Sequence, residues 1–283
     1  MQIGELLKEY RVTKGLTQAQ FARNIISRSY YSKVEKNEHR ITAEDLIDLL
    51  EQNNISLWSF LKKLSLKSDL QHGHQNNLEE EVMQAYYQAN RPKLEQLKKQ
   101  SANSSLSSEE EKLIVAGWIE CMKGSEEAPD IKLREDLKNK VFNIPFLDLN
   151  KLNLFCNFME FYDLESNFII TKQALNKYLD TTDSNIQELL LGIIGNLIYL
   201  SIKGNNYSYV DYLLQSANKI STKPKLLFAK EVIALYKNLI AYRQKKEKDS
   251  LATCKAIIAS FKAAGMEAYS RTLNAVLIKY SKN

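Results

Sequence analysis

Apolar residues recur at helical spacing along almost the whole chain, and this periodicity restricts its possible folds more than any other feature. From Leu78 onward the apolar segments are separated only by short polar breaks, and their centres lie near residues 85, 96, 116, 136, 156, 174, 194, 212, 234, 256 and 273. Because the 283 residues include only nine glycines and four prolines, few positions would interrupt a helix. The sequence therefore predicts an all-α protein.

The spacing of these segments also indicates a repeat architecture. Pairs of predicted helices recur about every 40 residues, which is the spacing of stacked helical-repeat arrays. The tetratricopeptide consensus is missing at the expected offsets, so the repeats are degenerate. About 200 residues suffice for a continuous core. An array of this length curls and presents a concave inner face, which suits an extended peptide or a partner helix.

A change of composition at Lys67–Asn77 separates this region from the N-terminal part of the chain. Apolar residues become few there, and Gly73 interrupts the segment. His72 and His74 have no cysteine or carboxylate at ligand spacing, which favours ordinary linker histidines over a metal site. We expect an N-terminal domain over residues 1–66, a linker over 67–79 and a helical-repeat domain over 80–283.

The segment Thr17–Glu35 is typical of two short helices joined by a tight corner. Thr17 can cap the first helix, with Gln20 as its partner in a capping box. Ser27 can cap the second helix, which would bury Tyr31 and Val34. Its other face would expose Arg28, Ser29, Ser32 and Lys33.

A short, polar and basic outer face suits the major groove of DNA. Phosphates attract the positive charge, and arginine or lysine can reach guanine edges. From Lys8 to Arg40 there are eight lysines and arginines and three glutamates, so the local net charge equals the +5 of the whole chain. Such a confined basic region indicates a nucleic-acid face. A helical hairpin with a solvated basic face is the alternative.

Several spaced motifs within residues 1–66 resemble the helix-turn-helix of the phage-repressor-like (XRE) family. They are Ile3–Leu7, Arg11, Lys14–Gln18, Phe21–Ala22 and Ser32–Lys36. This resemblance implies that Arg11 pairs with Glu35 as a buried structural tie, and that Gln18 touches the DNA backbone. It also places base-reading positions at Ser27, Arg28, Ser29 and Lys33, and we expect Arg40 to contact a phosphate.

The sequence departs from the XRE pattern at two places. The corner Asn24–Ser27 is one residue shorter than usual, and Asn37 replaces the usual glycine after Glu35-Lys36. Asparagine tolerates the left-handed conformation that a helix end needs, so the second change is mild.

Asparagines in the repeat region are candidates for ligand contact. Asn196 is the one strongly polar residue of an otherwise apolar run, and its amide needs partners because burying it unpaired costs roughly 1–3 kcal/mol. An asparagine amide can donate and accept, as a peptide bond requires. The alternative is that these amides bond neighbouring helices. The candidate peptide-binding residues are Asn153, Asn157, Asn196, Tyr199, Asn238, Arg271 and Asn274.

The order of the two regions resembles the Rgg family (Rgg/GadR/MutR) of transcription regulators from low-GC Gram-positive bacteria. The shortened corner is typical of that family, and weaker echoes follow at Ile169–Lys172, Asn196–Ile202 and Ile257–Gly265. The resemblance implies a right-handed superhelical, tetratricopeptide-like domain that dimerises and holds a short hydrophobic peptide. Some members carry an intermolecular disulfide, but the matching region Ile41–Leu46 has no cysteine.

The expected function is that of a homodimeric regulator that binds an operator in double-stranded promoter DNA and senses a short signalling peptide, as in quorum sensing. Alternatives are a helical-repeat scaffold for a folded partner, or a regulator controlled by a protein partner or stress signal. An enzyme is disfavoured because the sequence has no Gly-rich phosphate loop, metal-ligand spacing or nucleophile elbow, and we expect no cofactor.

The cellular compartment is expected to be the cytoplasm. Cys121, Cys156 and Cys254 lie far apart in apolar helical contexts, which is typical of reduced core thiols. Met1–Lys8 belongs to an amphipathic helix rather than a signal peptide. The longest uncharged run, about Leu189–Ile202, is too short to span a bilayer, so no membrane contact is expected.

Overall fold

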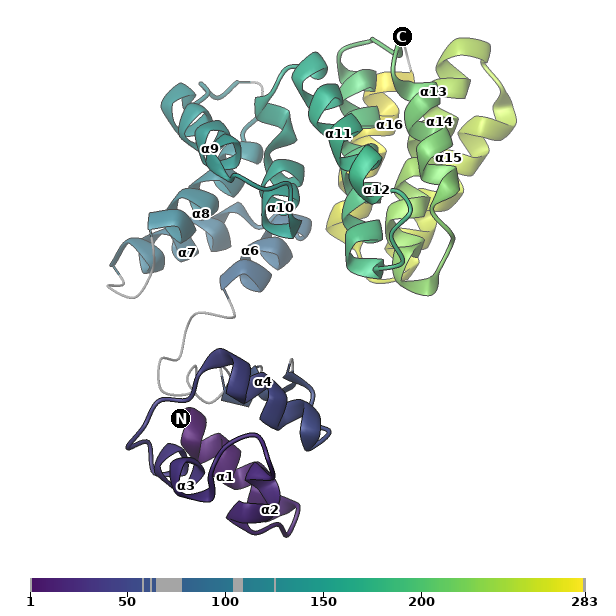
Figure 1. The fold of residues 1–283 in the computed structure, drawn as a ribbon. Helices are drawn as coiled ribbons and strands as arrows, with labels where there is room; N and C mark the ends of the chain where they lie inside the picture. Colours follow the sequence, from purple (N-terminus) through teal and green to yellow (C-terminus); the bar gives the residue numbers. More distant parts are fainter. Residues whose placement is uncertain are drawn as a thin grey trace. The chain divides into compact units, whose positions relative to one another are not determined.

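The chain is helical and divides into two compact units. The computed structural model describes residues 2–57, 59–61, 63, 64, 78–103, 109–124 and 126–281, and contains no strand within them. Unit 1 is Met1–Leu78 and unit 2 is Glu79–Asn283 (Figure 1). The all-α prediction is confirmed. Trp58 and nearly all of the linker expected at 67–79, including His72 and His74, lie outside the described residues.

Residues 2–56 of unit 1 form four α-helices, and hydroxyl side chains cap the starts of three of them. The four helices are α1 (Ile3–Thr13), α2 (Gln18–Ala22), α3 (Arg28–Glu35) and α4 (Ala43–Gln52). The hydroxyls of Thr17, Ser27 and Thr42 accept hydrogen bonds from backbone amides in the first turns of α2, α3 and α4, at 3.1–3.3 Å. These bonds satisfy amides that have no partner within the helix. The described residues of 57–64 are also helical.

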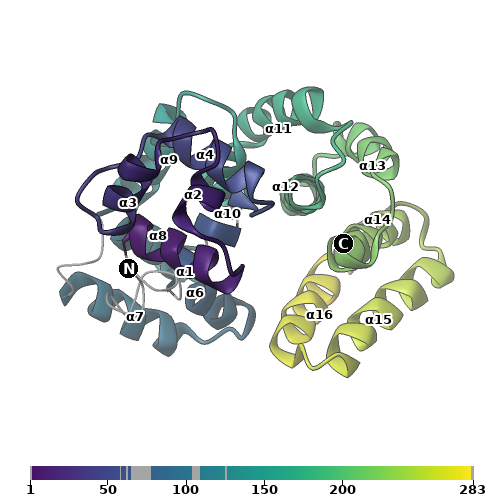
Figure 2. The same cartoon turned by 60° about the horizontal axis from the view of Figure 1, so that its bottom comes forward.

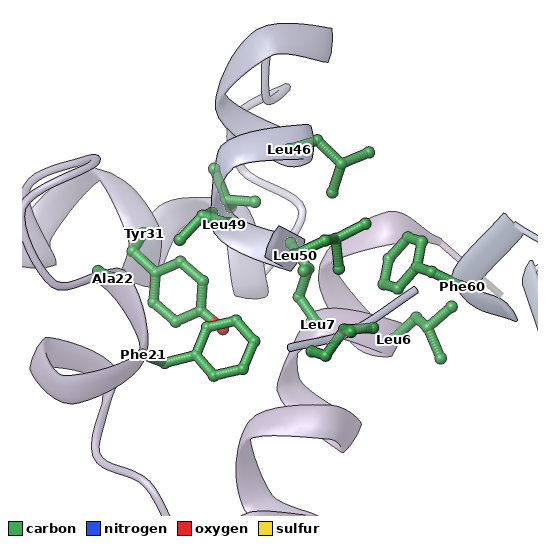
Figure 3. Close-up of a cluster of buried hydrophobic side chains, with 11 residues drawn as sticks. Leu6, Leu7, Phe21, Ala22, Tyr31, Leu46, Leu49, Leu50 and Phe60 are labelled. Atoms are coloured by element: carbon green, nitrogen blue, oxygen red, sulfur yellow. The ribbon is translucent and has the colours of Figure 1, made fainter. Parts of the chain in front are cut away.

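The core of unit 1 is one cluster of buried apolar side chains drawn from every helix (Figure 3). Its members are Leu6, Leu7, Phe21, Ala22, Tyr31, Val34, Leu46, Leu49, Leu50, Ile55 and Phe60. The rings of Phe21 and Tyr31 join α2 to α3, with centroids 5.4 Å apart. Truncating a fully buried leucine such as Leu50 to alanine costs about 2–5 kcal/mol. A loss of that size is comparable with the whole stability of a small domain, so the position of α3 depends on this core.

A close approach between α1 and α3 depends on Gly4. A Cβ at this position would lie 1.9 Å from the carbonyl oxygen of Val34, so only glycine fits. Asn37, just after α3, has the left-handed φ of 60° that its sequence context predicts. Its Oδ1 also accepts a hydrogen bond from the Gly4 amide at 3.1 Å, which fixes the start of α1 against the end of α3.

Unit 2 contains eleven α-helices within the described residues, and each centre predicted from the periodicity falls inside one of them. They are α6 (Leu78–Tyr87), α7 (Arg91–Asn103), α8 (Glu109–Cys121), α9 (Ile131–Asn143), α10 (Leu149–Phe158), α11 (Leu164–Tyr178), α12 (Ser184–Lys203), α13 (Val210–Lys219), α14 (Leu227–Lys245), α15 (Lys248–Ala263) and α16 (Glu267–Ser281). Two 3-10 turns, Met159–Phe161 and Pro224–Leu226, precede α11 and α14.

The long helix α12 lies at the centre of unit 2 and packs against α10, α11, α13 and α14. Figure 2 views it nearly end-on between α11 and α14. Its 20 residues are enough to cross a membrane by length and composition, and it is the one such helix among the described residues. Most of its apolar side chains are buried inside unit 2, so α12 forms the core of the repeat array.

Candidate DNA-binding face and inner ligand surface

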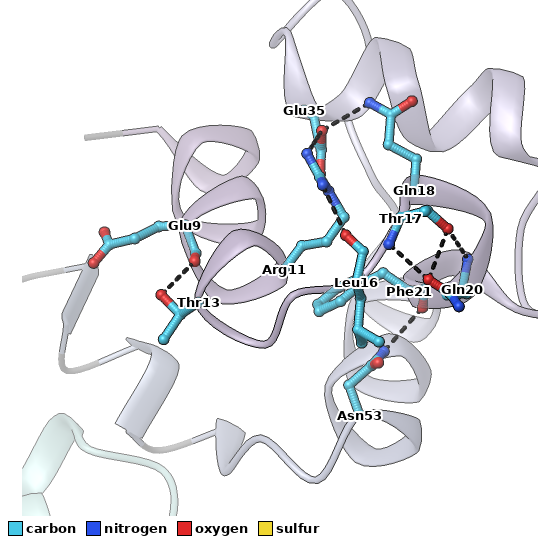
Figure 4. Close-up of polar contacts among 10 residues, drawn as sticks. All are labelled: Glu9, Arg11, Thr13, Leu16, Thr17, Gln18, Gln20, Phe21, Glu35 and Asn53. Carbon is cyan, nitrogen blue, oxygen red and sulfur yellow. Dashed lines mark hydrogen bonds and ion pairs between the residues drawn. The ribbon is translucent and has the colours of Figure 1, made fainter.

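One buried carboxylate joins the first three helices of unit 1 (Figure 4). Arg11 on α1 contacts Glu35 on α3 through two hydrogen bonds, Nε to Oε1 at 2.5 Å and Nη2 to Oε2 at 3.0 Å. The Nη1 atom of Arg11 also donates to the carbonyl of Leu16, before α2, at 2.9 Å. Gln18, the first residue of α2, donates from Nε2 to Oε2 of Glu35 at 2.8 Å. The structure thus brings Arg11, Glu35 and Gln18 together in one network.

The network keeps Glu35 ionised although only 5 % of the residue is exposed. Burial alone would raise the pKa of this carboxyl, but hydrogen bonds from Arg11 and Gln18 outweigh burial and hold the pKa below its usual value. Bidentate contact with a planar guanidinium is the favourable geometry for such a pair. The carboxylate therefore orients α3 relative to α1 and α2.

The outer face of α3 remains open. Arg28, Ser29 and Lys33 are all exposed there, and none makes a side-chain hydrogen bond to another described residue. Ser27 is also exposed, and its Oγ accepts from the Tyr30 amide at 3.1 Å, so its proton and one lone pair remain available to a partner. Three polar or basic side chains at the start and outer side of one helix match the requirements for contact with base edges.

Two basic positions flank this face. Arg40 is exposed, and its backbone carbonyl accepts a hydrogen bond from the Tyr30 hydroxyl at 2.8 Å, which holds the segment beside α3. Arg23, at the corner after α2, is also exposed and has φ 45° and ψ −128°. The sequence gives no pattern that singles out Arg23, because its conformation results from the short corner. We define the basic face as Arg23, Arg28, Ser29, Lys33 and Arg40.

In unit 2, two of the candidate asparagine amides bond the protein itself. Asn196 on α12 donates from Nδ2 to the carbonyl of Cys156 on α10 at 3.0 Å. Asn238 donates to the carbonyl of Ala234 on its own helix at 2.8 Å. Neither amide group is therefore wholly available to a ligand. Although the two asparagines are regularly spaced in the sequence, Asn196 joins two helices and Asn238 bonds within its own helix.

The other candidate residues differ in exposure. Asn153 on α10 and Asn274 on α16 are exposed, whereas Asn157 is half-buried. Arg271 is exposed on α16 and contacts Glu267, one turn earlier, at 3.7 Å. Tyr199 on α12 is half-buried, and its ring stacks on Tyr236 of α14 with centroids 5.7 Å apart.

Sequence reasoning missed a set of tyrosines to which Tyr199 belongs. Tyr86 and Tyr87 come from α6, Tyr236 from α14 and Tyr269 from α16. The Tyr87 ring contacts the rings of Tyr86 and Tyr269, with centroids 5.8 and 5.2 Å apart, and Tyr236 lies near Tyr86, Tyr87 and Tyr269. We call Tyr86, Tyr87, Tyr199, Tyr236 and Tyr269 the inner tyrosine surface. The double tyrosine at 86–87 was the only local signal of it.

The hydroxyls of this surface have no hydrogen-bond partner among the described residues. Although the rings are largely buried, none of the five hydroxyls is among the fully buried partnerless atoms. Burial raises the pKa of Tyr87 and of Tyr199 to about 12, and raises the pKa of the other three as well. All five hydroxyls are therefore neutral at physiological pH and can both donate and accept.

The described residues give no support for metal or thiol chemistry. Among them there is no group of three or more His, Cys, Asp or Glu side chains that could hold a metal ion. The three cysteines are free. Burial raises the pKa of Cys156 to about 12 and that of Cys254 to about 11, and raises that of Cys121 too, so the thiols stay protonated and unreactive.

Comparisons with solved structures agree with this fold. The SHP pheromone receptor Rgg2 of Streptococcus dysgalactiae is 18% identical, with a TM-score of 0.72 over 98% of this chain and 99% of that chain. A proposed transcriptional regulator from Listeria monocytogenes is 20% identical, with a TM-score of 0.73 over 99% and 97%. The PrgX/cCF10 complex is 18% identical, with a TM-score of 0.68 over 99% of both chains. Comparison with curated protein sequences found no match.

Two family models match the chain in the order of its units. Residues 7–57 match the helix-turn-helix family, which covers the Arg11–Glu35 network and the exposed face of α3. Residues 62–275 match the C-terminal domain of the HTH-type transcriptional regulator Rgg, which covers the inner tyrosine surface. The chain therefore belongs to the Rgg family of helix-turn-helix transcriptional regulators.

Proposed function

We propose that this regulator recognises an operator in double-stranded promoter DNA through the basic face of unit 1. The observation that carries the proposal is the exposure of Arg28, Ser29 and Lys33 on a helix fixed from behind by the Arg11–Glu35 pair. Arg28 and Lys33 reach guanine edges, while Arg23 and Arg40 contact phosphates on either side. Gln18 contributes to DNA binding indirectly, because its Nε2 donates to Glu35 and so helps to position α3.

We further propose that unit 2 binds a short, largely apolar signalling peptide on the inner tyrosine surface. Five neutral phenol hydroxyls offer donors and acceptors to a peptide backbone, and their rings offer apolar contact to its side chains. Solved relatives of the same fold support this assignment, since they include a pheromone receptor and a PrgX/cCF10 complex. A peptide of this kind connects the regulator with quorum sensing.

The peptide controls DNA binding through linkage in a cytoplasmic homodimer. A ligand that prefers one arrangement of unit 2 shifts the population toward it, and the shift changes the affinity of the paired DNA-binding units for their operator. Two half-sites in the operator would match the symmetry of such a dimer. Light scattering of the full chain tests the dimer separately from the other assignments.

The DNA assignment is tested by salt-dependent binding to DNA from upstream of its own gene. Arg40→Ala, which removes a proposed phosphate contact, should weaken binding and lower the salt slope by about one. Lys132→Ala, which removes an exposed lysine from α9 in unit 2, is the matched control and should bind normally. Equal behaviour of the two variants would contradict the assignment, as would binding of the wild type that ignores DNA sequence.

The peptide assignment is tested by calorimetry with pools of synthetic octapeptides rich in aliphatic and aromatic residues. Tyr236→Phe removes one hydroxyl of the inner tyrosine surface and should weaken peptide binding. Tyr162→Phe removes a hydroxyl that contacts the Lys138 carbonyl at 3.5 Å, outside that surface, and should not. If no pool binds the wild type, while a protein co-purifies in a stable complex, control by a protein partner replaces the peptide.

A further inference from the structure

Tyr87 joins two ends of unit 2 that are far apart in the sequence. It ends α6, the first described helix of the unit, and its ring contacts Phe228 of α14 and Tyr269 of α16, with centroids 5.8 and 5.2 Å apart. The neighbouring Tyr86 instead packs on Trp118 of α8, with centroids 4.6 Å apart. The two adjacent tyrosines therefore contact different helices. Tyr86 contacts α8, whereas Tyr87 connects α6 to the C-terminal helices α14 and α16.

The rings that receive Tyr87 form a cluster that does not depend on it. Phe228, Phe261 and Tyr269 come from α14, α15 and α16, and each pair of their centroids lies 5.4–5.5 Å apart. Tyr87 meets Phe228 and Tyr269 nearly edge-on, at interplanar angles of 86° and 75°. Edge-to-face contact is the favourable geometry for aromatic pairs. This aromatic triad would remain in place, with one face open, if Tyr87 moved away.

We propose that the aromatic triad of Phe228, Phe261 and Tyr269 is a binding subsite for an aromatic side chain of the ligand, and that Tyr87 occupies it until the ligand displaces it. The inference rests on the proposed function of unit 2 as a peptide-binding domain. Tyr87 belongs to the inner tyrosine surface, so a peptide bound there reaches the triad. A tyrosine or phenylalanine of the peptide makes the same edge-to-face contacts, whereas an aliphatic residue does not.

Because Tyr87 and the ligand compete for the aromatic triad, binding of the ligand changes the contacts of α6. While Tyr87 is in place, it holds the end of α6 against α14 and α16. Displacing it releases that end of α6, and α6 is the first described helix after the segment that joins the two units. A ligand with an aromatic residue therefore changes the part of unit 2 that is connected to unit 1, whereas an aliphatic ligand does not.

The first test uses the tyrosine side chain itself, 4-methylphenol, as the probe on the full chain. Tyr87→Ala vacates the subsite and should bind 4-methylphenol at least tenfold more tightly than the wild type, measured by calorimetry or ligand-observed NMR. Tyr87→Phe restores the ring and should again exclude the probe. Tyr162→Ala removes a half-buried tyrosine elsewhere, whose ring contacts Phe155, and serves as the matched control. An equal gain in Tyr162→Ala, or no gain in Tyr87→Ala, overturns the proposal.

A second test needs no soluble Tyr87→Ala variant. Tyr269→Leu removes one ring of the triad and leaves Tyr87 in place, so amides at the end of α6 should exchange hydrogen at least tenfold faster than in the wild type. Unchanged exchange in α6 means that the triad does not hold Tyr87, and it overturns the proposal.

A third test separates this inference from the function on which it rests. Two pools of octapeptides are compared, one with a single phenylalanine among aliphatic residues and one with leucine in its place. Tyr87→Ala should gain about tenfold in affinity for the phenylalanine pool and little for the leucine pool. Equal gains overturn the subsite and leave peptide binding intact. If no peptide binds any variant but 4-methylphenol binds Tyr87→Ala alone, the subsite stands and the peptide function fails.

Discussion

Gln18 and Arg11 both donate to the carboxylate of Glu35, at 2.8 Å from Gln18 and at 2.5 and 3.0 Å from Arg11. Three helices of unit 1 are thereby fixed by one acidic group that is 5 % exposed. The arrangement couples the stability of unit 1 to the geometry of its DNA-binding face, since α3 carries both Glu35 and the basic residues. Changes in this network should therefore affect folding before they affect recognition.

Removing Arg11 should be strongly destabilising. Arg11→Ala leaves the Glu35 carboxylate buried without its cation, and breaking such a pair costs about 3–5 kcal/mol. Urea unfolding followed by NMR signals of α3 measures the loss. The double variant Arg11→Met, Glu35→Leu should recover much of it, because no buried charge remains. A loss below about 1 kcal/mol in Arg11→Ala would show that the pair behaves like an exposed one.

The same carboxylate predicts a pH dependence for unit 1. The pKa of Glu35 is lower in the folded protein than in the unfolded chain, where it is near 4.5. The ionised carboxylate therefore contributes to the stability of unit 1 above about pH 4.5. This contribution is lost as the pH falls through the folded pKa. The urea midpoint of unit 1 should therefore decrease below about pH 4.5. Glu35→Gln should start lower and show a smaller decrease. If the urea midpoint decreased equally below pH 4.5 in the wild type and in Glu35→Gln, other carboxylates would be responsible for the decrease.

Gly4→Ala should disrupt the contact of α1 with α3. The added Cβ would meet the Val34 carbonyl oxygen at 1.9 Å and Asn37 Oδ1 at 2.6 Å. Backbone cannot move aside cheaply, so we expect a loss of at least about 1–3 kcal/mol. Gly124→Ala is the control, since nothing lies within 4 Å of the position that its added methyl group would take. Thermal unfolding of both variants checks the prediction, and equal melting temperatures would contradict it.

Arg23→Gly should stabilise unit 1. A non-glycine residue at φ 45° and ψ −128° is strained by about 1–3 kcal/mol. Glycine relieves this strain but costs about 0.5–1 kcal/mol in chain entropy, so a modest net gain in stability remains. Arg23→Ala removes the same charge without relieving the strain and should show no gain. A lower melting temperature for the glycine variant than for the alanine variant would refute the strain.

Arg28 and Gln18 should differ in how they affect DNA recognition. Arg28→Ala should relax the sequence preference by about 1–3 kcal/mol at one base pair, because an exposed guanidinium reads a base edge. Gln18→Ala should weaken binding to all sequences alike, since its amide supports Glu35 rather than a base. Affinities for an operator library distinguish the two outcomes. Equal loss of preference in both variants would defeat this division of roles.

Local patterns predicted most of the helices, because caps and apolar spacing act within a few residues. Thr17 and Ser27 cap helices as their sequence context indicates. The Arg11–Glu35 pair was expected only through family resemblance, since the two residues are 24 positions apart. The Gly4–Asn37 contact and the inner tyrosine surface were not predicted. Both depend on how distant helices meet, which periodicity within a segment does not determine.

The asparagine spacing shows why a regular pattern is a weak guide to a binding site. Asn196 and Asn238 lie 42 residues apart, yet the first bonds a neighbouring helix and the second its own helix. The sequence left open whether such amides serve a ligand or the protein, because both roles require the same residue type in an apolar helix. Only the packing of α10 against α12 distinguishes the two roles.

The bond between Asn196 and Cys156 limits the kind of group that a ligand could offer to this exposed side chain. Nδ2 is directed to the Cys156 carbonyl at 3.0 Å and to the Cys156 Sγ at 3.6 Å, so Oδ1 is the atom that remains for an incoming partner. An amide oxygen accepts hydrogen bonds and does not donate them. A ligand that reached Asn196 would therefore have to present an N–H or O–H group, and a carbonyl in the same place would be repelled.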